Sequence, residues 1–297
     1  VILDEPLSIE TSGGKPWEPK NFNEEYAGNI ILKKALMKSI NIVSVKLMQK
    51  LGPEKVIRNA RKFGIKSPLG KNLSLALGTS GLSPLEVSSA YSVIANLGVY
   101  NEPYLIQQID DFQGNRLYEH FYQGVQQFAP DTLYPLLDMM QGVIERGTGR
   151  IVRRMGFKHP AAGKTGTTNN FKDAWFNGFT KDISTSVWVG FDNYDSMRTK
   201  SKKGLTGASA AAPIWVHFMR KALEGKSMVK FPVPENIKFE TVDIETGRLP
   251  EEFSLEKMKV AVKDDVDLSK ISNLEIELGN SLVGPLGLGD FNNSSAP

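Results

Sequence analysis

The spacing of apolar residues changes near residue 150, and this change constrains the fold more than any other feature of the sequence. Before it, apolar residues recur every three or four positions, as in amphipathic helices, in the stretches 29–51, 53–64, 83–98 and 130–147. After it, aromatic and β-branched runs predict two strands joined by a turn, at 174–180 and 185–191. A further helix is expected at 213–224 and a further strand at 236–244. A helical half followed by a sheet half with helices on it predicts an α+β or mixed fold, with a ligand cleft between the halves.

Two of the predicted helices carry boundary signals. Ser83 can cap the helix that follows it, and Glu86, three residues later, completes a capping box. Gly98 is expected at the left-handed position that ends this helix. In the first stretch, Ser39 and its polar neighbours are poor residues for a helix interior, so a break is predicted there.

Composition excludes several classes of protein. The 297 residues are 40% hydrophobic and 23% charged, which is typical of a globular chain, and a net charge of +3 is too small to favour nucleic acid as a partner. Because there is no cysteine, and because three histidines stand in unrelated contexts, we expect no disulfide, thiol nucleophile or metal site. The sequence contains no apolar run of about 18 residues, so no membrane span is predicted. The chain begins at Val1 without an initiator methionine, so we interpret it as a piece of a longer protein.

The run Lys164-Thr165-Gly166-Thr167-Thr168 concentrates one cation and three hydroxyls in five residues. On an edge strand, the lysine places a cation beside the cleft and the threonine hydroxyls can hold a carboxylate. The glycine keeps the strand surface clear, so that a peptide can lie along it as a further strand. Lys-Thr-Gly also occurs by chance in ordinary turns, so this run needs support from the rest of the chain.

A second element, Ser39-Ile40-Asn41, lies at the predicted helix break. Serine and asparagine side chains compete with helical backbone hydrogen bonds wherever they occur, so a simple break would contain the same residues. A Ser-x-Asn match is expected about once by chance in a chain of this size. The element therefore gains meaning only from its context.

That context resembles the transpeptidase domain of bifunctional (class A) penicillin-binding proteins, to which the K-T-G and S-x-N elements above both correspond. Further matching stretches follow in the family's order: WEPKN at 17–21, ALMKSIN at 35–41, LALGTS at 75–80, SPLE at 83–86, RGTG at 146–149, DAWFNGFT at 173–180 and AAPIW at 211–215. The resemblance implies a penicillin-binding/β-lactamase-like fold of the α+β class, in which a helical lobe packs on an antiparallel sheet with flanking helices.

The resemblance also implies a domain organisation. A transpeptidase domain, incomplete at its N-terminus, is expected over about 1–250, with its helical lobe at about 29–150 and its sheet part at about 151–250. The remaining residues, 251–297, are expected to be a C-terminal extension with a loose tail, because the sequence from about residue 279 is rich in Gly, Asn, Ser and Pro.

The resemblance further implies roles for individual residues. Ser39 would relay a proton, Asn41 would align the substrate's peptide group, and Lys164 would shape the proton path and the local positive potential.

Substrate binding would fall to the strand that follows this lysine, through Thr165, Gly166, Thr167 and Thr168. Thr165 and Thr167 would bind the terminal carboxylate, and the Thr167 backbone N–H would help to form the oxyanion hole.

The family's nucleophile is the serine of an S-x-x-K element upstream of S-x-N, whose lysine lies one helical turn later. The sequence holds three S-x-x-K matches, at Ser12/Lys15, Ser227/Lys230 and Ser254/Lys257. The last two follow Lys164, and the first contains two glycines before a proline, which would not hold a helical turn. We interpret all three as coincidental and expect the true element on the order of two dozen residues before Val1. A glycosyltransferase domain and a membrane anchor are expected further upstream.

The implied activity is that of a peptidoglycan D,D-transpeptidase. Its partners would be stem peptides that end in D-Ala-D-Ala, with β-lactam antibiotics as trapping mimics and with no metal or organic cofactor. The parent protein would act on the periplasmic, extracytoplasmic face of the bacterial inner (cytoplasmic) membrane, to which the upstream anchor would attach it. This chain alone would be inactive.

Two other functions fit the same motifs. A β-lactamase-type hydrolase would need a residue that activates water, and no glutamate is obviously placed for this; rapid turnover of penicillin would favour it. A non-catalytic peptidoglycan-binding module that has lost its serine would form no acyl-enzyme. The residues immediately before Val1 distinguish this module from an enzyme.

Overall fold

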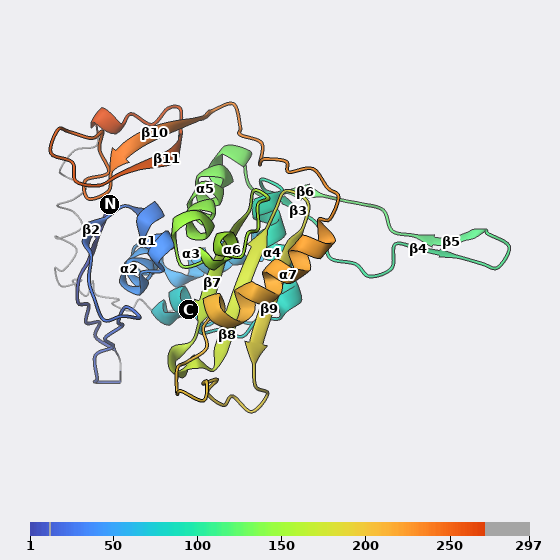
Figure 1. The fold of residues 1–297 in the computed structure, drawn as a ribbon, viewed down its shortest axis with the longest axis horizontal. Coiled ribbons are helices and arrows are strands. Elements are labelled where there is room, and N and C mark those ends of the chain that lie inside the picture. The colour runs from blue at the N-terminus through green and yellow to red at the C-terminus, as the bar shows by residue number, and fades with distance from the viewer. Residues whose placement is uncertain (12, 271–297) are drawn as a thin grey trace, which may run out of the picture.

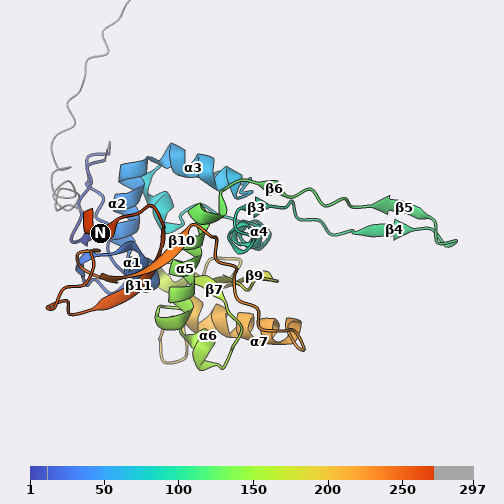
Figure 2. The same cartoon turned by 90° about the horizontal axis from the view of Figure 1, so that it is seen from above.

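A three-stranded antiparallel sheet lies at the centre of the protein. The computed structural model describes residues 1–11 and 13–270. The strands run in the order β7 (Ala162–Thr167), β8 (Asp173–Phe179) and β9 (Ser184–Gly190), so β7 is an edge strand, as predicted. Helix α4 (Pro84–Ala95) covers one face and helix α7 (Ala212–Ala222) the other (Figure 2). The predicted α+β class with flanking helices is confirmed.

Helices α1, α2, α3 and α5 lie beside the free edge of β7 and on the α4 side of the sheet, whereas α6 contacts α5 and α7 (Figures 1 and 2). The longest of them, α5, runs along β7 and contacts both β7 and α1. The bounds are α1 (Leu32–Lys38), α2 (Asn41–Leu51), α3 (Pro53–Lys62), α5 (Pro130–Arg146) and α6 (Ile151–Arg154). Shorter turns of helix occur at η1 (Leu73–Leu77), η2 (Asn169–Phe171), η3 (Gly207–Ala211) and η4 (Leu268–Lys270).

The capping box predicted for α4 is confirmed, but the end of this helix differs from the prediction. Ser83 Oγ accepts a hydrogen bond from the Glu86 N–H, and the Glu86 carboxylate accepts one from the Ser83 N–H. Two residues with positive φ follow the helix, Leu97 with φ of 48° and the expected Gly98 with φ of 104°, so the left-handed turn begins one residue before the glycine. The Gly98 N–H then bonds to the Val93 carbonyl, which completes a Schellman motif. Glycine is still required at 98, because a Cβ there would lie 2.0 Å from the Phe128 carbonyl oxygen.

Outside the central sheet, the described strands form two-stranded pairs. β1 (Ile2–Asp4) pairs with β2 (Gly28–Ile30), and β3 (Val99–Tyr100) pairs with β6 (Val125–Gln126). Between β3 and β6 the chain runs out into an arm made of β4 (Gln108–Asp110) and β5 (Arg116–Glu119), which projects from the body in Figure 1. None of these short strands was expected from the sequence, because each is two to four residues long.

A C-terminal hairpin joins residues on both sides of position 250. β10 (Ile237–Asp243), which was predicted, pairs along its whole length with β11 (Lys257–Lys263), which was not. β11 also contacts α5. The division into a domain over 1–250 and an extension stays a prediction, and the loose tail predicted from residue 279 lies outside the described residues.

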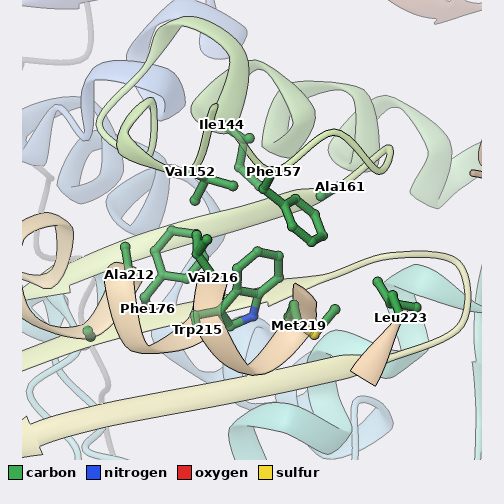
Figure 3. Close-up of a cluster of buried hydrophobic side chains, with 11 residues drawn as sticks. Ile144, Val152, Phe157, Ala161, Phe176, Ala212, Trp215, Val216, Met219 and Leu223 are labelled. Atoms are coloured by element: carbon green, nitrogen blue, oxygen red, sulfur yellow. The ribbon is translucent and has the colours of Figure 1, made fainter. Parts of the chain in front are cut away.

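The central core forms between α7 and the sheet (Figure 3). The Trp215 ring lies between Phe157 and Phe176, with edge-to-face centroid distances of 5.2 Å to each. Its indole N–H donates to the Gly178 carbonyl, and a Cβ at this glycine would come within 3.0 Å of the indole ring. Ile144 of α5 packs into the same core, so the C-terminal end of α5 is fixed against the sheet.

No helix in the described ranges, 1–11 and 13–270, is long and apolar enough to cross a membrane.

Candidate functional site

The K-T-G strand and the S-x-N helix break meet in space. Lys164 Nζ, on β7, lies 2.7 Å from Ser39 Oγ and donates a hydrogen bond to it. The same amine donates to the Thr165 carbonyl oxygen at 3.0 Å. Among the residues that the structure describes, no carboxylate pairs with this amine. The cation and the hydroxyl are therefore brought together by the tertiary fold, with no charged partner to hold the lysine elsewhere.

Ser39 occupies a strained point between two helices. The break predicted in the stretch 29–51 is confirmed: α1 ends at Lys38 and α2 begins at Asn41. Ser39 adopts a left-handed conformation, with φ of 58° and ψ of 48°, and the Ile40 N–H closes the end of α1 on the Ala35 carbonyl. A left-handed conformation costs a residue with a side chain on the order of 1 kcal/mol, and such strain is common where a side chain must be aimed at a site. Here it aims the hydroxyl at Lys164.

Asn41 is held by a segment that sequence reasoning had not connected to it. Its side-chain amide donates to the Lys20 carbonyl at 2.8 Å. The next residue, Asn21, is buried, and its Oδ1 accepts hydrogen bonds from the Asn41 and Ile42 N–H groups at 3.0 and 3.2 Å. Asn21 thus caps α2 from 20 residues away, whereas the residue before α2, Ile40, offers no side-chain cap.

The two threonines expected to bind a carboxylate are each fixed by one hydrogen bond. Thr165 Oγ1 lies 2.7 Å from Thr148 Oγ1, and Thr167 Oγ1 accepts from the Gly207 N–H at 3.0 Å. Because the Gly207 N–H occupies one acceptor position of the Thr167 hydroxyl oxygen, the Thr167 hydroxyl proton is free for a ligand. Thr168 lies beyond the end of the strand, where its Oγ1 accepts from the Asp173 N–H at the start of β8.

Backbone directions along β7 favour the predicted oxyanion donor. The Thr168 N–H donates to the Asp173 carbonyl, toward β8. N–H groups of successive residues in a strand point to opposite sides, so the Thr167 N–H points away from β8, to the free edge. Gly166 packs closely on Trp175 of β8, where an added Cβ would lie 3.0 Å from the Trp175 Cβ. The free edge of β7 therefore carries outward N–H groups beside Lys164, and the Thr167 N–H is one of them.

Burial lowers the pKa of the Lys164 amine from 10.5 to about 8. Removal of the ammonium from water disfavours the charged form, and the two neutral oxygens that it contacts compensate only in part. Near neutral pH this amine carries a positive charge and yet gives up its proton readily, which suits a group in a proton path.

A row of polar residues on the sheet begins at Lys164, and an aromatic contact joins two of the segments that carry site residues. Across the sheet, Lys164 pairs with Asn177, and Asn177 pairs with Ser186. Asn177 Oδ1 and Ser186 Oγ are buried without a hydrogen-bond partner among the described residues. Phe22 and Phe171 meet edge to face with their ring centroids 6.1 Å apart, which joins the segment that holds Asn41 to the turn after β7.

None of the S-x-x-K matches that the structure describes has the geometry of the family element. Ser227 and Lys230 lie in a segment without helix, and Lys257 is the first residue of β11, outside any helix shared with Ser254. Ser12 lies outside the described residues. The hollow of about 400 Å³ beside α5, lined in part by Tyr134 and Phe231, also contains none of the predicted site residues.

A lysine on a free strand edge, bonded to the serine of an S-x-N break, defines a site of the penicillin-recognising acyltransferase type. The chain belongs to the family of penicillin-binding protein transpeptidase domains, whose family model matches residues 2–219. The fold and family expected from the sequence are thus confirmed.

Similar proteins narrow the comparison to one kind of penicillin-binding protein. The chain is 39% identical over 246 residues to penicillin-binding protein 1A of Neisseria gonorrhoeae, covering 80% of this chain and 30% of that protein. It is 35% identical over 300 residues to penicillin-binding protein 1A of Pseudomonas aeruginosa, covering 84% and 35%. The chain therefore spans about a third of the length of the curated relatives that it matches.

Solved structures agree with this family. The crystal structure of penicillin-binding protein 1A from Haemophilus influenzae superposes with a TM-score of 0.79 at 27% identity, covering 87% of this chain and 44% of that one. The structure of PonA1 from Mycobacterium tuberculosis in complex with penicillin V gives a TM-score of 0.67 at 28% identity, covering 78% and 65%.

Proposed function

We propose that this chain is the part of a serine-type D,D-transpeptidase that binds the stem peptide and completes its proton path. The observation that carries the proposal is the hydrogen bond from Lys164 to Ser39 beside the free edge of β7. An ordinary Lys-Thr-Gly turn and an ordinary helix break have no reason to meet. Their contact in a member of this family supports a shared role in binding the substrate and moving a proton.

The nucleophile in this proposal is the serine of an S-x-x-K element upstream of Val1. Its Oγ attacks the penultimate D-Ala carbonyl of the donor stem peptide, the C–N bond to the terminal D-Ala breaks, and an acyl-enzyme ester forms. The proton lost by the serine reaches the leaving amine through Ser39, whose hydroxyl is bonded to Lys164. An amine of a neighbouring stem peptide then attacks the ester, which forms the cross-link and frees the serine.

The substrate lies along β7 as an added strand. Thr165 and Thr167 hold its terminal carboxylate under the positive potential of Lys164. Gly166 lies between them on the strand, and Thr168 contributes from the turn just beyond the end of the strand. The outward N–H of Thr167 donates to the oxyanion that develops during attack. Asn41, fixed by the Lys20 carbonyl, aligns the peptide group through its side-chain amide.

The proposed partners follow from the same site. They are peptidoglycan stem peptides that end in D-Ala-D-Ala, and β-lactams that mimic this end and remain as the ester. The whole protein would work at the extracytoplasmic face of the bacterial inner membrane. This chain by itself, without the nucleophile, would be inactive.

The proposal is tested with a fluorescent penicillin added to the full-length protein and, in parallel, to residues 1–297. We expect a stable adduct on the full-length protein, mapped by peptide mass spectrometry to a serine before Val1, and none on the shorter chain. Rapid release of hydrolysed penicillin would identify a β-lactamase-type hydrolase. A complete lack of acylation of the full-length protein would identify a non-catalytic binding module, and either result overturns the proposal.

A further inference from the structure

Thr148 contacts both halves of the site at once. It lies in the R-G-T-G turn that follows α5, between the helical lobe and the sheet. Its backbone N–H donates to the Met37 carbonyl at 3.0 Å, in the last turn of α1 before Ser39. Its hydroxyl oxygen lies 2.7 Å from the Thr165 hydroxyl oxygen on β7. One residue thus joins the helix that ends at Ser39 to the strand that carries the expected carboxylate ligands.

The two glycines that flank Thr148 permit this close approach. A Cβ at Gly147 would lie 2.4 Å from the Met37 carbonyl oxygen, and one at Gly149 would lie 3.2 Å from the Val143 carbonyl oxygen. The Gly147 and Gly149 N–H groups both donate to that Val143 carbonyl. The turn is therefore fixed on α5 by its backbone, and its threonine is held half-buried against the strand.

We propose that Thr148 is a positioning residue that orients the Thr165 hydroxyl for the substrate carboxylate; this inference rests on the proposed function. Two hydrogen-bonded hydroxyls carry two protons, and only one of these lies in the hydrogen bond between the two oxygens. Thr148 donates to Thr165, so that the Thr165 proton stays free for the carboxylate. Thr148 itself touches no reacting atom and acts only through its neighbour.

The reverse direction of this hydrogen bond makes the opposite prediction. If Thr165 donated to Thr148, removal of the Thr148 hydroxyl would free the Thr165 proton, and binding of a carboxylate would be unchanged or tighter. With Thr148 as donor, the same removal leaves Thr165 without its fixed orientation, and binding of a carboxylate becomes weaker. A Thr148→Val substitution, which keeps the shape of the side chain, separates the two cases.

The experiment measures the second-order rate constant of acylation of the full-length protein by benzylpenicillin and by its methyl ester, which lacks the carboxylate charge. We expect Thr148→Val to lower the rate constant of acylation by benzylpenicillin about tenfold, which corresponds to the loss of one hydrogen bond to a charged group. The rate constant for the methyl ester should fall less than about twofold. Thr148→Ser, which keeps the hydroxyl, should stay within about threefold of the wild type for both compounds. Thr132→Val is the matched control, because this exposed threonine at the start of α5 bonds only locally, to the Asp131 carboxylate.

Each outcome is decisive. Equal slowing with both compounds means that Thr148 only maintains the fold, and an unchanged or faster reaction with benzylpenicillin means that the hydrogen bond runs the other way; either overturns the inference. If Thr148→Ser fails to restore the rate, the hydroxyl is not the active group. If the wild-type protein forms no adduct at all, the proposed function fails first and the inference fails with it.

Discussion

Lys164 and Ser39 are 125 residues apart in the sequence, yet the lysine amine donates a 2.7 Å hydrogen bond to the serine hydroxyl. Two different structural elements position the two atoms. The lysine is positioned by an edge strand that pairs residue by residue with β8, and the serine by a left-handed break that turns the chain between two helices. A short contact between groups from such separate elements requires the whole fold, so it reports on the site more directly than either motif alone.

Removal of the Ser39 hydroxyl should slow acylation without unfolding the protein. In Ser39→Ala the proposed proton path from the nucleophile loses its intermediate hydroxyl, and general acid–base steps of this kind contribute about 10²-fold or more. We expect the rate constant for acylation of the full-length protein by labelled penicillin to fall by about that factor. Ser44→Ala is the control, because this serine, five residues later in α2, bonds only to the Ile40 carbonyl. Equal rates in the two variants would exclude Ser39 from the path.

The desolvated amine of Lys164 should make the stability of the chain depend on pH in a defined direction. Its pKa is about 8 in the folded protein and near 10.5 in the unfolded chain. Below pH 8 the amine is protonated in both the folded and the unfolded state, so the full free-energy cost of burying the charged amine applies. Between pH 8 and pH 10.5 the folded state has lost the proton that the unfolded state keeps, so the free energy of unfolding rises with pH.

Lys164→Met removes this penalty. Denaturant titration should find the variant more stable than the wild type near pH 7, by at most about 3 kcal/mol for a shift of this size, with the difference shrinking toward pH 10.5. Lys158→Met replaces an exposed lysine and should change the free energy of unfolding by less than about 0.5 kcal/mol. A difference between Lys164→Met and the wild type that stays constant from pH 7 to pH 10 would contradict this account.

The sequence predicts the parts of the site that lie within one element, and it misses those that depend on tertiary contacts. The break at Ser39 and the capping box at Ser83 follow from the local preferences of serine, asparagine and glutamate. The strands that flank the turn 181–184 follow from their β-branched and aromatic residues. Each of these is decided by neighbours fewer than about ten residues away.

The remainder could not be predicted because its partners are distant in the chain. Asn21 caps a helix that begins 20 residues later, and Thr148 meets a strand 17 residues later. A helix cap is normally predicted from the residue immediately before the helix, and Ile40, which precedes α2, has no side chain that can accept a hydrogen bond. The end of α4 was misplaced by one residue for a different reason: the left-handed turn begins at Leu97, and Gly98 follows it at a positive φ and in close contact with the Phe128 carbonyl, both of which favour glycine.

Loss of Asn21 should destabilise the fold and loosen the S-x-N end of the site. Its amide also donates to both carboxylate oxygens of the buried Asp4, at 2.9 and 3.1 Å. Asn21→Ala would leave two N–H groups of α2 and part of this carboxylate unpaired, at a cost of about 2–4 kcal/mol. Asn23→Ala, at an exposed position whose side chain bonds only to Glu25, should cost less than about 0.5 kcal/mol. Similar unfolding midpoints for the two variants would refute the proposed capping.

Asp138 should contribute more to stability than an ordinary surface carboxylate. Its Oδ2 accepts from the Lys33 ammonium at 2.7 Å and from the Ala261 N–H at 3.0 Å, so it joins α1, α5 and β11. The side chains of both charged residues are almost buried, with 11% and 14% of their surface exposed, and removal of one member of such a pair leaves the other charge unpaired. We expect Asp138→Ala to lower the free energy of unfolding by about 3 kcal/mol in denaturant titrations. Glu256→Ala, which breaks the more exposed ion pair with Lys34, should lower it by less than about 1 kcal/mol.

The arm that carries β4 and β5 should be dispensable for the fold. Every residue of these two strands is exposed, and ten of the large apolar side chains on the surface lie between Tyr104 and Val125. An isolated two-stranded ribbon is marginally stable at best, so the arm adds little to the free energy of unfolding and presents an apolar surface to solvent. Replacement of residues 104–122 by Asn-Gly should leave the unfolding midpoint within about 2 °C of the wild type and raise the concentration at which the chain aggregates. Ile144→Ala, at a fully buried position in the central core, should lower the midpoint by several times that amount. A comparable drop in the shortened chain would show that the arm packs on the body and contributes to the free energy of folding.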